Sequence, residues 1–217
     1  MGISHYFRCC LNCGSLFPLK NRFLCRLCWA QALTDQAKKR VRRQINRKNY
    51  EAVVLWDWVP DKNNALSSYL SALKGWGGPE EWEALARLLI QQRFKLSLEW
   101  TQQSIIVPAP SVRKPKEDHA FQLALAIGKI LDIQVLPALE KCSFSLRKEH
   151  QRGRSKSQRE LLQVKKRENF SQLYLQDYKV IFVDDVLTTG GTAAASLGAL
   201  SPMKSHEIWC LAQRALL

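Results

Sequence analysis

The sequence predicts an α/β protein: a mostly parallel sheet flanked by helices, preceded by a small N-terminal module built on four cysteines. Two observations predict the sheet. Continuous apolar runs such as "SIIVPAP" and "VIFV" are typical of strands buried on both faces, and they alternate with segments of helical periodicity, as in right-handed strand–helix–strand units. A third observation predicts the module, because cysteines crowd the first 28 residues.

The segments after the cysteines can be assigned in chain order. Residues 38–48 hold seven Lys or Arg and are predicted as a helix or ordered linker. Residues 51–59, "EAVVLWDWV", predict a strand, and residues 63–78 predict a short helix that ends at its glycines. Residues 79–94 predict a strong helix, because a proline and two acids open it and apolar residues recur at helical spacing.

The second half continues the alternation. We expect strands at 104–110, 133–139, 178–186 and 206–216, with helices at 118–132 and 192–200. Residues 147–167 contain nine Lys or Arg and two Glu; their first half is too polar and glycine-broken to pack, which predicts a loop. Residues 157–170, "SQRELLQVKKRENF", are predicted as the helix that closes this loop.

Composition limits the class of protein. With 217 residues and 46% hydrophobic residues, the chain can bury one substantial core and carry a small appendage. Its formal charge of +14 implies a polyanionic partner, such as nucleic acid or a phosphorylated ligand, although a protein that is merely basic remains an alternative. We see no signal peptide and no continuous apolar run long enough for a membrane span, so we expect a cytoplasmic protein.

The cysteines have the spacing of a metal site. Cys10 and Cys13 form one C-x2-C pair, and Cys25 and Cys28 form a second, so two tight turns present four thiolates to one zinc ion. Cys9 is a rival for the first ligand, but its spacing to Cys13 is one residue too long. Four sulfur ligands leave no open coordination position, so this zinc is expected to be structural.

The stretch "VIFVDDVLTTGGTAAA" predicts a phosphate site at a strand end. Asp184 and Asp185 follow four apolar strand residues, where two carboxylates suit vicinal hydroxyls or the water shell of Mg²⁺. The loop that follows, Thr188, Thr189, Gly190, Gly191 and Thr192, lets backbone N–H groups converge on a phosphate at a helix start. Together these features describe a ribose 5-phosphate site. A Walker B strand is the main competitor, but no Walker A sequence accompanies it.

Residues 180–192 resemble the PRPP-binding signature of type I phosphoribosyltransferases. With the four-cysteine module, "SALKGWGG", "VPAPSVRK" and "SQRELLQVKKRENF", nearly the whole chain resembles the ComF family (competence protein F, ComFC). Gln158, Leu161, Arg167 and Asn169 stand where that family has a Gln, a Leu and an Arg…Asn pair. Where the family has an Arg-Gly-Phe-Asn-Gln tract, this chain reads "PKEDH", residues 115–119, which departs from the pattern.

The resemblance implies a phosphoribosyltransferase-type fold in three parts: a zinc module at 1–35, a basic linker or helix at 36–50, and the phosphoribosyltransferase-like domain at 51–217. It implies that Asp184 and Asp185 contact the ribose hydroxyls of PRPP and that residues 188–192 surround its 5-phosphate. It also implies Mg²⁺ bound with PRPP, and a pyrophosphate loop that consists of Ala109, Pro110, Ser111, Arg113 and Lys114. A solvated basic turn remains the alternative for the last two residues.

The family also implies a role in natural transformation, in which the protein handles incoming single-stranded DNA in the cytosol, with a competence-machinery protein as a further partner. Two basic segments could contact a DNA backbone, and the second could also close over the pocket as a lid. They contain Lys38, Lys39, Arg40, Arg42, Arg43, Arg147, Arg152, Arg154, Lys156 and Arg159. The alternative function is an active phosphoribosyltransferase of the nucleotide-salvage type, which transfers ribose 5-phosphate to an acceptor that the sequence does not identify; no residue is assigned as catalytic.

Overall fold

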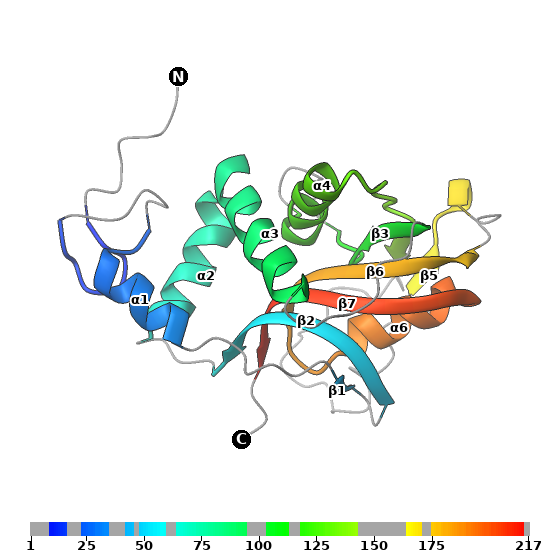
Figure 1. The fold of residues 1–217 in the computed structure, drawn as a ribbon, viewed down its shortest axis with the longest axis horizontal. Coiled ribbons are helices and arrows are strands. Elements are labelled where there is room, and N and C mark those ends of the chain that lie inside the picture. Colours follow the sequence, from blue (N-terminus) through cyan, green and yellow to red (C-terminus); the bar gives the residue numbers. More distant parts are fainter. Residues whose placement is uncertain are drawn as a thin grey trace, which may run out of the picture.

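The computed structural model describes residues 9–16, 23–34, 42–45, 48–59, 64–94, 103–112, 118–142, 164–170 and 175–214 (Figure 1). Its centre is a five-stranded sheet in the order β1-β2-β7-β6-β3. The four strands from β2 to β3 are parallel, and β1 joins β2 antiparallel. The strands are β1 Arg42–Ile45, β2 Lys48–Trp58, β3 Ser104–Pro108, β6 Leu175–Leu187 and β7 Met203–Arg214. The expected α/β architecture with a mostly parallel sheet is confirmed.

Helices cover both faces of the sheet, as Figure 1 shows. Alternate residues of β6 belong to different cores: Ile181 and Val183 face the helices α2, α3 and α4, whereas Val180 and Phe182 face α6. This explains the continuous apolar run in the sequence, because successive side chains of β6 pack into the cores on opposite faces of the sheet. The helices are α1 Arg26–Thr34, α2 Ala65–Trp76, α3 Pro79–Phe94, α4 His119–Leu131 and α6 Gly191–Leu200.

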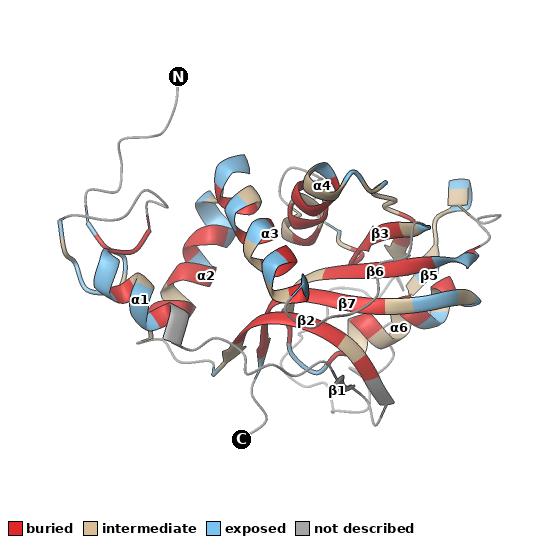
Figure 2. Ribbon diagram, viewed as in Figure 1, coloured by how far each residue is buried: buried red, intermediate tan, exposed pale blue. Residues whose placement is uncertain are grey.

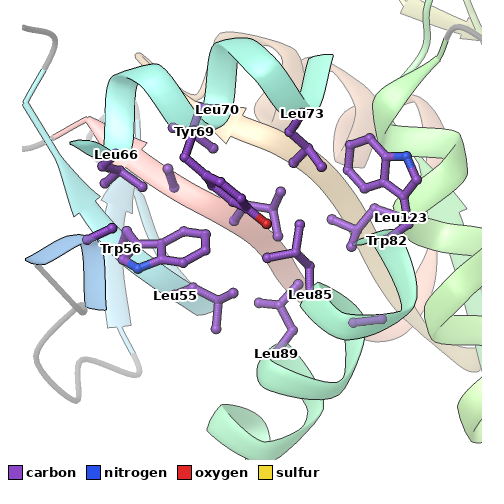
Figure 3. Close-up of a cluster of buried hydrophobic side chains, with 14 of the residues drawn as sticks. Leu55, Trp56, Leu66, Tyr69, Leu70, Leu73, Trp82, Leu85, Leu89 and Leu123 are labelled. Carbon is purple, nitrogen blue, oxygen red and sulfur yellow. The ribbon is translucent and has the colours of Figure 1, made fainter. Parts of the chain in front are cut away.

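The larger core lies between the sheet and α2, α3 and α4 (Figure 2). Tyr69 projects from α2 toward Trp56 of β2, and their rings meet edge to face at a centroid distance of 6.1 Å (Figure 3). Leu85 and Leu89 of α3 complete the layer and are fully buried. Burying each large apolar side chain of this kind contributes roughly 1.5–3 kcal/mol, so this layer holds α2 and α3 firmly on the sheet.

Local signals in the sequence start and stop the helices that reach the site. Asn64 caps α2, because its side-chain oxygen accepts a hydrogen bond from the N–H of Ser67 at 2.6 Å. Asp118 caps α4 in the same way through the N–H of Phe121. Asp132 ends α4 in the left-handed conformation with φ 54°. The start of α4 is therefore fixed at the candidate site, whereas α2 reaches the site with its last turn, which contains Lys74.

The crossovers diverge between β3 and β6. From β3 the chain runs through α4 to Val135, which forms a parallel bridge with Ile106 on the outer side of β3. From β6 the chain runs instead through α6 to β7, on the other side and the other face. The space between the carboxyl ends of β3 and β6 is therefore a topological switch point, the place where open α/β sheets bind ligands.

A buried ion network ties α3 to the sheet. Glu207 of β7 accepts two hydrogen bonds from the guanidinium of Arg93 in α3, at 3.0 and 3.1 Å. It also accepts from the ammonium of Lys179 in β6 and from the indole of Trp209 at 2.9 Å. Burial raises the pKa of Glu207, but the hydrogen bonds from Lys179, Arg93 and Trp209 outweigh it and lower the pKa. The carboxylate is thus held ionised inside the protein.

Three segments differ from the sequence predictions. Residues 42–45 form strand β1 instead of a helix or linker, because pairing with β2 satisfies backbone groups at the exposed edge of that strand. The strand expected at 133–139 reduces to the single bridge at Val135, and Pro137, which lacks an N–H, lies in the following residues without regular structure.

The third difference is a small hairpin in place of the predicted helix at 157–170. Within that range, Val164–Lys166 form strand β5, which pairs antiparallel with β4, Leu139–Lys141, and Glu168–Phe170 form a short 3-10 helix. Arg167 holds the hairpin together, since its side chain donates to the carbonyl of Leu139 at 3.1 Å. The remaining part of the predicted helix, 157–163, lies outside the described residues.

Candidate functional site

A pocket of about 190 Å³ opens at the switch point. It combines the loop after β3, the acids of β6, the start of α4, the last turn of α2 and the end of β4. These elements come from five separate parts of the chain and meet only because the strands are parallel. The pocket is lined by Lys74, Ala109, Pro110, Ser111, Asp118, His119, Ala120, Lys141, Asp184 and Asp185.

The two acids lie within β6 and not beyond it, since the strand continues to Leu187. Both line the pocket although they alternate along the strand. Asp184 accepts a hydrogen bond from the N–H of Asp185 at 2.8 Å, and Asp185 accepts one from the N–H of Val186 at 2.7 Å. Burial, and the neighbouring charge of Asp185, raise the pKa of Asp184. The two adjacent acids therefore differ in pKa.

Asp185 is the ionised member of the pair, and its partner is a lysine that the sequence prediction missed. The ammonium of Lys74, in the last turn of α2, lies 2.8 Å from Oδ2 of Asp185. Burial alone raises the pKa of Asp185, but Lys74 lowers it below its usual value, helped by the Val186 N–H and His119. Lys74 belongs to "SALKGWGG", which we used as a family feature without assigning a role to its lysine.

His119 is the second residue that the prediction missed. Its Nδ1 lies 3.5 Å from Oδ2 of Asp185, and its Nε2 lies 2.9 Å from the carbonyl oxygen of Lys74. Because a carbonyl only accepts, Nε2 carries a proton. The ring stacks on Trp82 of α3 with an interplanar angle of 19°. His119 ends the tract "PKEDH", so the part that departs from the family pattern supplies a residue of the pocket.

The predicted pyrophosphate loop lies beside the acids. Ala109, Pro110 and Ser111 line the pocket, and the N–H of Ala109 donates to the carbonyl of Val183 at 2.8 Å, which joins this loop to β6. The structure therefore brings together two parts of the sequence that are more than 70 residues apart. The other two predicted residues, Arg113 and Lys114, lie outside the described residues.

The Thr/Gly loop continues directly from β6 but does not line this pocket. Thr188 and Thr189 are exposed, and Gly190 adopts φ 75° as the N-terminal cap of α6, with no side chain capping the helix. A residue with a Cβ adopts this φ only with strain, so glycine is required there. The N–H of Gly191 donates to Oγ1 of Thr189 at 3.4 Å, and the helix N-terminus as a whole offers a favourable position for an anion next to the acids.

Lys141 adds a second cation to the pocket. It ends strand β4 and is half-buried, and we find no ion pair for its side chain among the described residues. The hairpin also carries Lys165 and Lys166 on β5, where Lys165 pairs with Glu140 at 3.0 Å. Nothing in the chain order indicated that this hairpin reaches the pocket, because only Leu139 of β4 falls within a predicted strand, 133–139, and β5 falls within the predicted helix 157–170.

The acids do not form a group of metal ligands. Among the described residues, a group of three or more His, Cys, Asp or Glu ligand atoms close enough for one ion occurs only at the four cysteines. Asp185 already holds an ammonium at the distance of a hydrogen bond. Mg²⁺ favours one or two free carboxylates together with substrate phosphates and water. The donor set around Asp185 therefore does not fit the Mg²⁺ that the sequence implied.

The four predicted cysteines are positioned to bind one metal ion. The sulfur atoms of Cys10, Cys13, Cys25 and Cys28 all lie within 4.8 Å of one another, which is compatible with a structural zinc. Cys9 is exposed and does not belong to this group, as the spacing predicted. In the turn that contains Cys10 and Cys13, the N–H of Gly14 donates to the carbonyl of Cys10, and Gly14 itself adopts φ 74°.

The cysteine module rests on α2. Phe23 and Trp29 both pack on Tyr69, with ring centroids at 6.0 and 5.0 Å, and join the same core as α3. Asn12 links the two parts by polar contacts, since its amide donates to the sulfur of Cys28 and its oxygen accepts from Ser68 of α2, each at 3.4 Å. The module therefore packs on the helix that supplies Lys74.

Most of the basic residues predicted to contact DNA cannot be placed. Residues 38–40 and 147–159 lie outside the described residues, as do Gln158 and Leu161 of the family pattern. Arg42 and Arg43 lie on β1, at the edge of the sheet farthest from β3. In the part of the chain that the structure describes, no helix has both the length and the apolar character to cross a membrane.

We compared the sequence with models of protein families and with curated proteins. No protein-family model matches the chain, and no curated protein is significantly similar to it. The site must therefore be interpreted from its own residues and geometry.

Proposed function

We propose that this protein binds PRPP or a related phosphorylated ribose in the pocket between β3 and β6. One observation carries the proposal: Ala109–Ser111 and the acids Asp184 and Asp185, predicted separately as parts of a PRPP site, line one pocket at the switch point. In this proposal the domain has the phosphoribosyltransferase fold and the chain is a protein of the ComF type.

Each chemical group of PRPP can be matched to residues at or next to the pocket. The ribose hydroxyls donate to the acid pair, because ionised or half-buried carboxyl groups are strong acceptors. The 5-phosphate binds the uncapped N-terminus of α6 after Gly190, and the pyrophosphate lies along Ala109–Ser111. Lys141 supplies positive charge to the lining of the pocket. The sequence indicates no site for an acceptor base, so binding without transfer is the function that we place first.

Calorimetric titration with PRPP and with ribose 5-phosphate tests this function. We expect the wild type to bind and Asp184→Asn/Asp185→Asn to lose about tenfold or more in affinity, since a hydrogen bond to a charged group contributes about 1.5–3 kcal/mol. Asp177→Asn is the matched control, because Asp177 is an exposed acid near the start of the same strand. Equal binding by the double variant would refute the assignment of the acids.

The second function is an active phosphoribosyltransferase. It needs an acceptor and the release of pyrophosphate, so we expect pyrophosphate to appear when PRPP is mixed with the correct base. A panel of purine and pyrimidine bases, with the double acid variant as a blank, measures this. Binding of PRPP without pyrophosphate release for any base would leave recognition, and not transfer, as the function.

The net charge of +14 favours a further activity, the handling of single-stranded DNA during natural transformation. We expect binding of an oligonucleotide whose affinity falls steeply with salt, and charge reversal at Lys38–Arg40 or Arg147–Arg159 to weaken it. Fluorescence anisotropy at several salt concentrations measures both. If the affinity for the oligonucleotide changed neither with salt nor with these charge reversals, the electrostatic interpretation would be contradicted, and with it the link to transformation.

We also propose that the four cysteines hold one structural zinc. Metal analysis of the purified protein should find about one zinc per chain. Cys10→Ser/Cys25→Ser should lose the metal and expose Phe23 and Trp29, which a rise in Trp accessibility to quenchers would report. Serine at Cys9 is the matched control, because Cys9 lies outside the group of four. A metal-free wild type with freely titrating thiols would overturn the site.

A further inference from the structure

We infer that Lys74 takes the place of a divalent cation at the acid pair, so that the pocket binds its phosphorylated ligand without Mg²⁺. This inference rests on the proposed function, which it deepens by defining how the acids are neutralised. It also replaces the sequence expectation of Mg²⁺ bound with PRPP.

The position of Lys74 is the first observation. Its ammonium lies 2.8 Å from Oδ2 of Asp185, and the two side chains are 40% and 18% exposed. Both residues line the pocket, so the ammonium borders the ligand space, although the Lys74 side chain is also in contact with solvent. An ammonium in this position has the same electrostatic effect as a bound metal ion, because it places a positive charge next to a carboxylate of the pocket.

The coordination of Asp185 is the second observation. Its Oδ1 accepts from the N–H of Val186 at 2.7 Å, and its Oδ2 faces both Lys74 and Nδ1 of His119. Each oxygen therefore has a partner before any ligand arrives. A metal ion would have to displace the ammonium from Oδ2 and enter beside a histidine ring.

His119 fixes the lysine as well as the acid. Its protonated Nε2 donates to the backbone carbonyl of Lys74, while its Nδ1 faces Asp185. The three residues form a closed triangle between α2, α4 and β6, and the stack on Trp82 holds the ring in place. Lys74 is thus a positioned counter-ion, not a flexible surface lysine that happens to reach an acid.

The charge of the whole pocket supports the same conclusion. Lys74 and Lys141 face Asp118, Asp184 and Asp185. Burial raises the pKa of Asp184 and that of Asp118, which favours the neutral form of each and lowers the negative charge available to a cation. Lys74 neutralises Asp185, and Lys141 adds a further ammonium to the pocket, which suits a phosphate better than a metal.

Calorimetry in buffer freed of divalent ions by a resin tests the inference; a soluble chelator would also remove metal from the cysteines. We expect the wild type to bind PRPP and ribose 5-phosphate with affinities that change less than about threefold when Mg²⁺ is added. In Lys74→Met, Asp185 loses its counter-ion and repels the phosphates, so metal-free affinity should fall about tenfold or more, and Mg²⁺ should restore most of it.

Lys129→Met is the matched control, because Lys129 also pairs with an acid, Glu83 of α3, but lies outside the pocket. This variant should bind as the wild type does with and without metal. A wild type that binds only when Mg²⁺ is present would overturn the inference and leave the proposed function intact. Absence of binding under both conditions would overturn the proposed function itself, so the two failures are distinct.

A second measurement needs no phosphorylated ligand. Titration of the wild type with Mg²⁺ alone should give no heat of binding at millimolar concentration, because Oδ2 of Asp185 is occupied by the ammonium. A stoichiometric Mg²⁺ site that disappears in Asp184→Asn/Asp185→Asn would contradict the inference directly.

Discussion

Two carboxylates on neighbouring parallel strands each contact a lysine and a second basic side chain, yet they differ in exposure. Glu207 of β7 is fully buried with Arg93 and Lys179, whereas Asp185 of β6 meets Lys74 and His119 in an open pocket. A buried ion network cannot exchange its partners with solvent and serves to fix α3 on the sheet. An accessible network can give up its hydrogen bonds to a ligand, so the same chemistry becomes a binding site.

The sharpest contrast should come from Glu207→Gln. This change leaves the guanidinium of Arg93 and the ammonium of Lys179 without a negative charge in the core, so we expect a loss of about 3–5 kcal/mol in the free energy of unfolding. Urea unfolding measures the loss. Glu140→Gln is the control, because Glu140 pairs with the exposed Lys165 and should cost less than about 1 kcal/mol. Equal costs for the two variants would show that burial does not separate the networks.

The same network should make the protein sensitive to acid. Because Lys179, Arg93 and Trp209 lower the pKa of folded Glu207 below its unfolded value, its contribution is present above about pH 4.3 and is lost as the pH falls through the folded pKa. The free energy of unfolding should therefore fall more steeply with acid in the wild type than in Glu207→Gln. Parallel pH profiles below about pH 5 would contradict this.

Asp184 should change the free energy of unfolding with pH in the opposite direction to Glu207. Its folded pKa is raised by burial and by Asp185, so its contribution is present below the unfolded value, about 3.9, and is lost as the pH rises through the folded pKa. Asp184→Asn removes this titration, and we expect the variant to gain about 1.4 kcal/mol relative to the wild type for each pH unit between the unfolded and the folded pKa. Unfolding at several pH values checks it; a difference that does not change with pH would refute the raised pKa.

The smallest effect on stability should come from Lys74→Met. Because Lys74 is 40% exposed, solvent screens its ion pair with Asp185, and we expect a change below about 1 kcal/mol in the free energy of unfolding. Thermal unfolding measures it. A loss comparable with that of Glu207→Gln would make the pocket pair a structural element and not a ligand site.

Local spacing was sufficient for some features of this protein. The two C-x2-C pairs lie within one short segment, so their convergence depends on turns that the sequence itself encodes, and the four sulfurs meet as predicted. The buried strands and the helices α2, α3, α4 and α6 were predictable for the same reason, because periodicity and capping residues such as Asn64 act within a few residues.

Other features were beyond the sequence. Val135 lies in an apolar run that suggested a strand, but only one bridge forms, and Pro137, which lacks an N–H, follows two residues later. The segment that contains Val164 has helical composition, yet it pairs with β4. Propensity is a weak guide in such segments, since pairing with a distant part of the chain overrides it.

The sequence by itself determined the cysteine site, the alternation that builds a parallel sheet, and the two acids beside a Thr/Gly loop. Only the tertiary structure decided which cations those acids meet. Lys74 is 111 residues from Asp185 in the chain and His119 is 66 residues away (185 minus 74 and 185 minus 119), so no spacing rule connects them. Coulomb attraction and hydrogen bonding act through space, and the fold alone sets those distances.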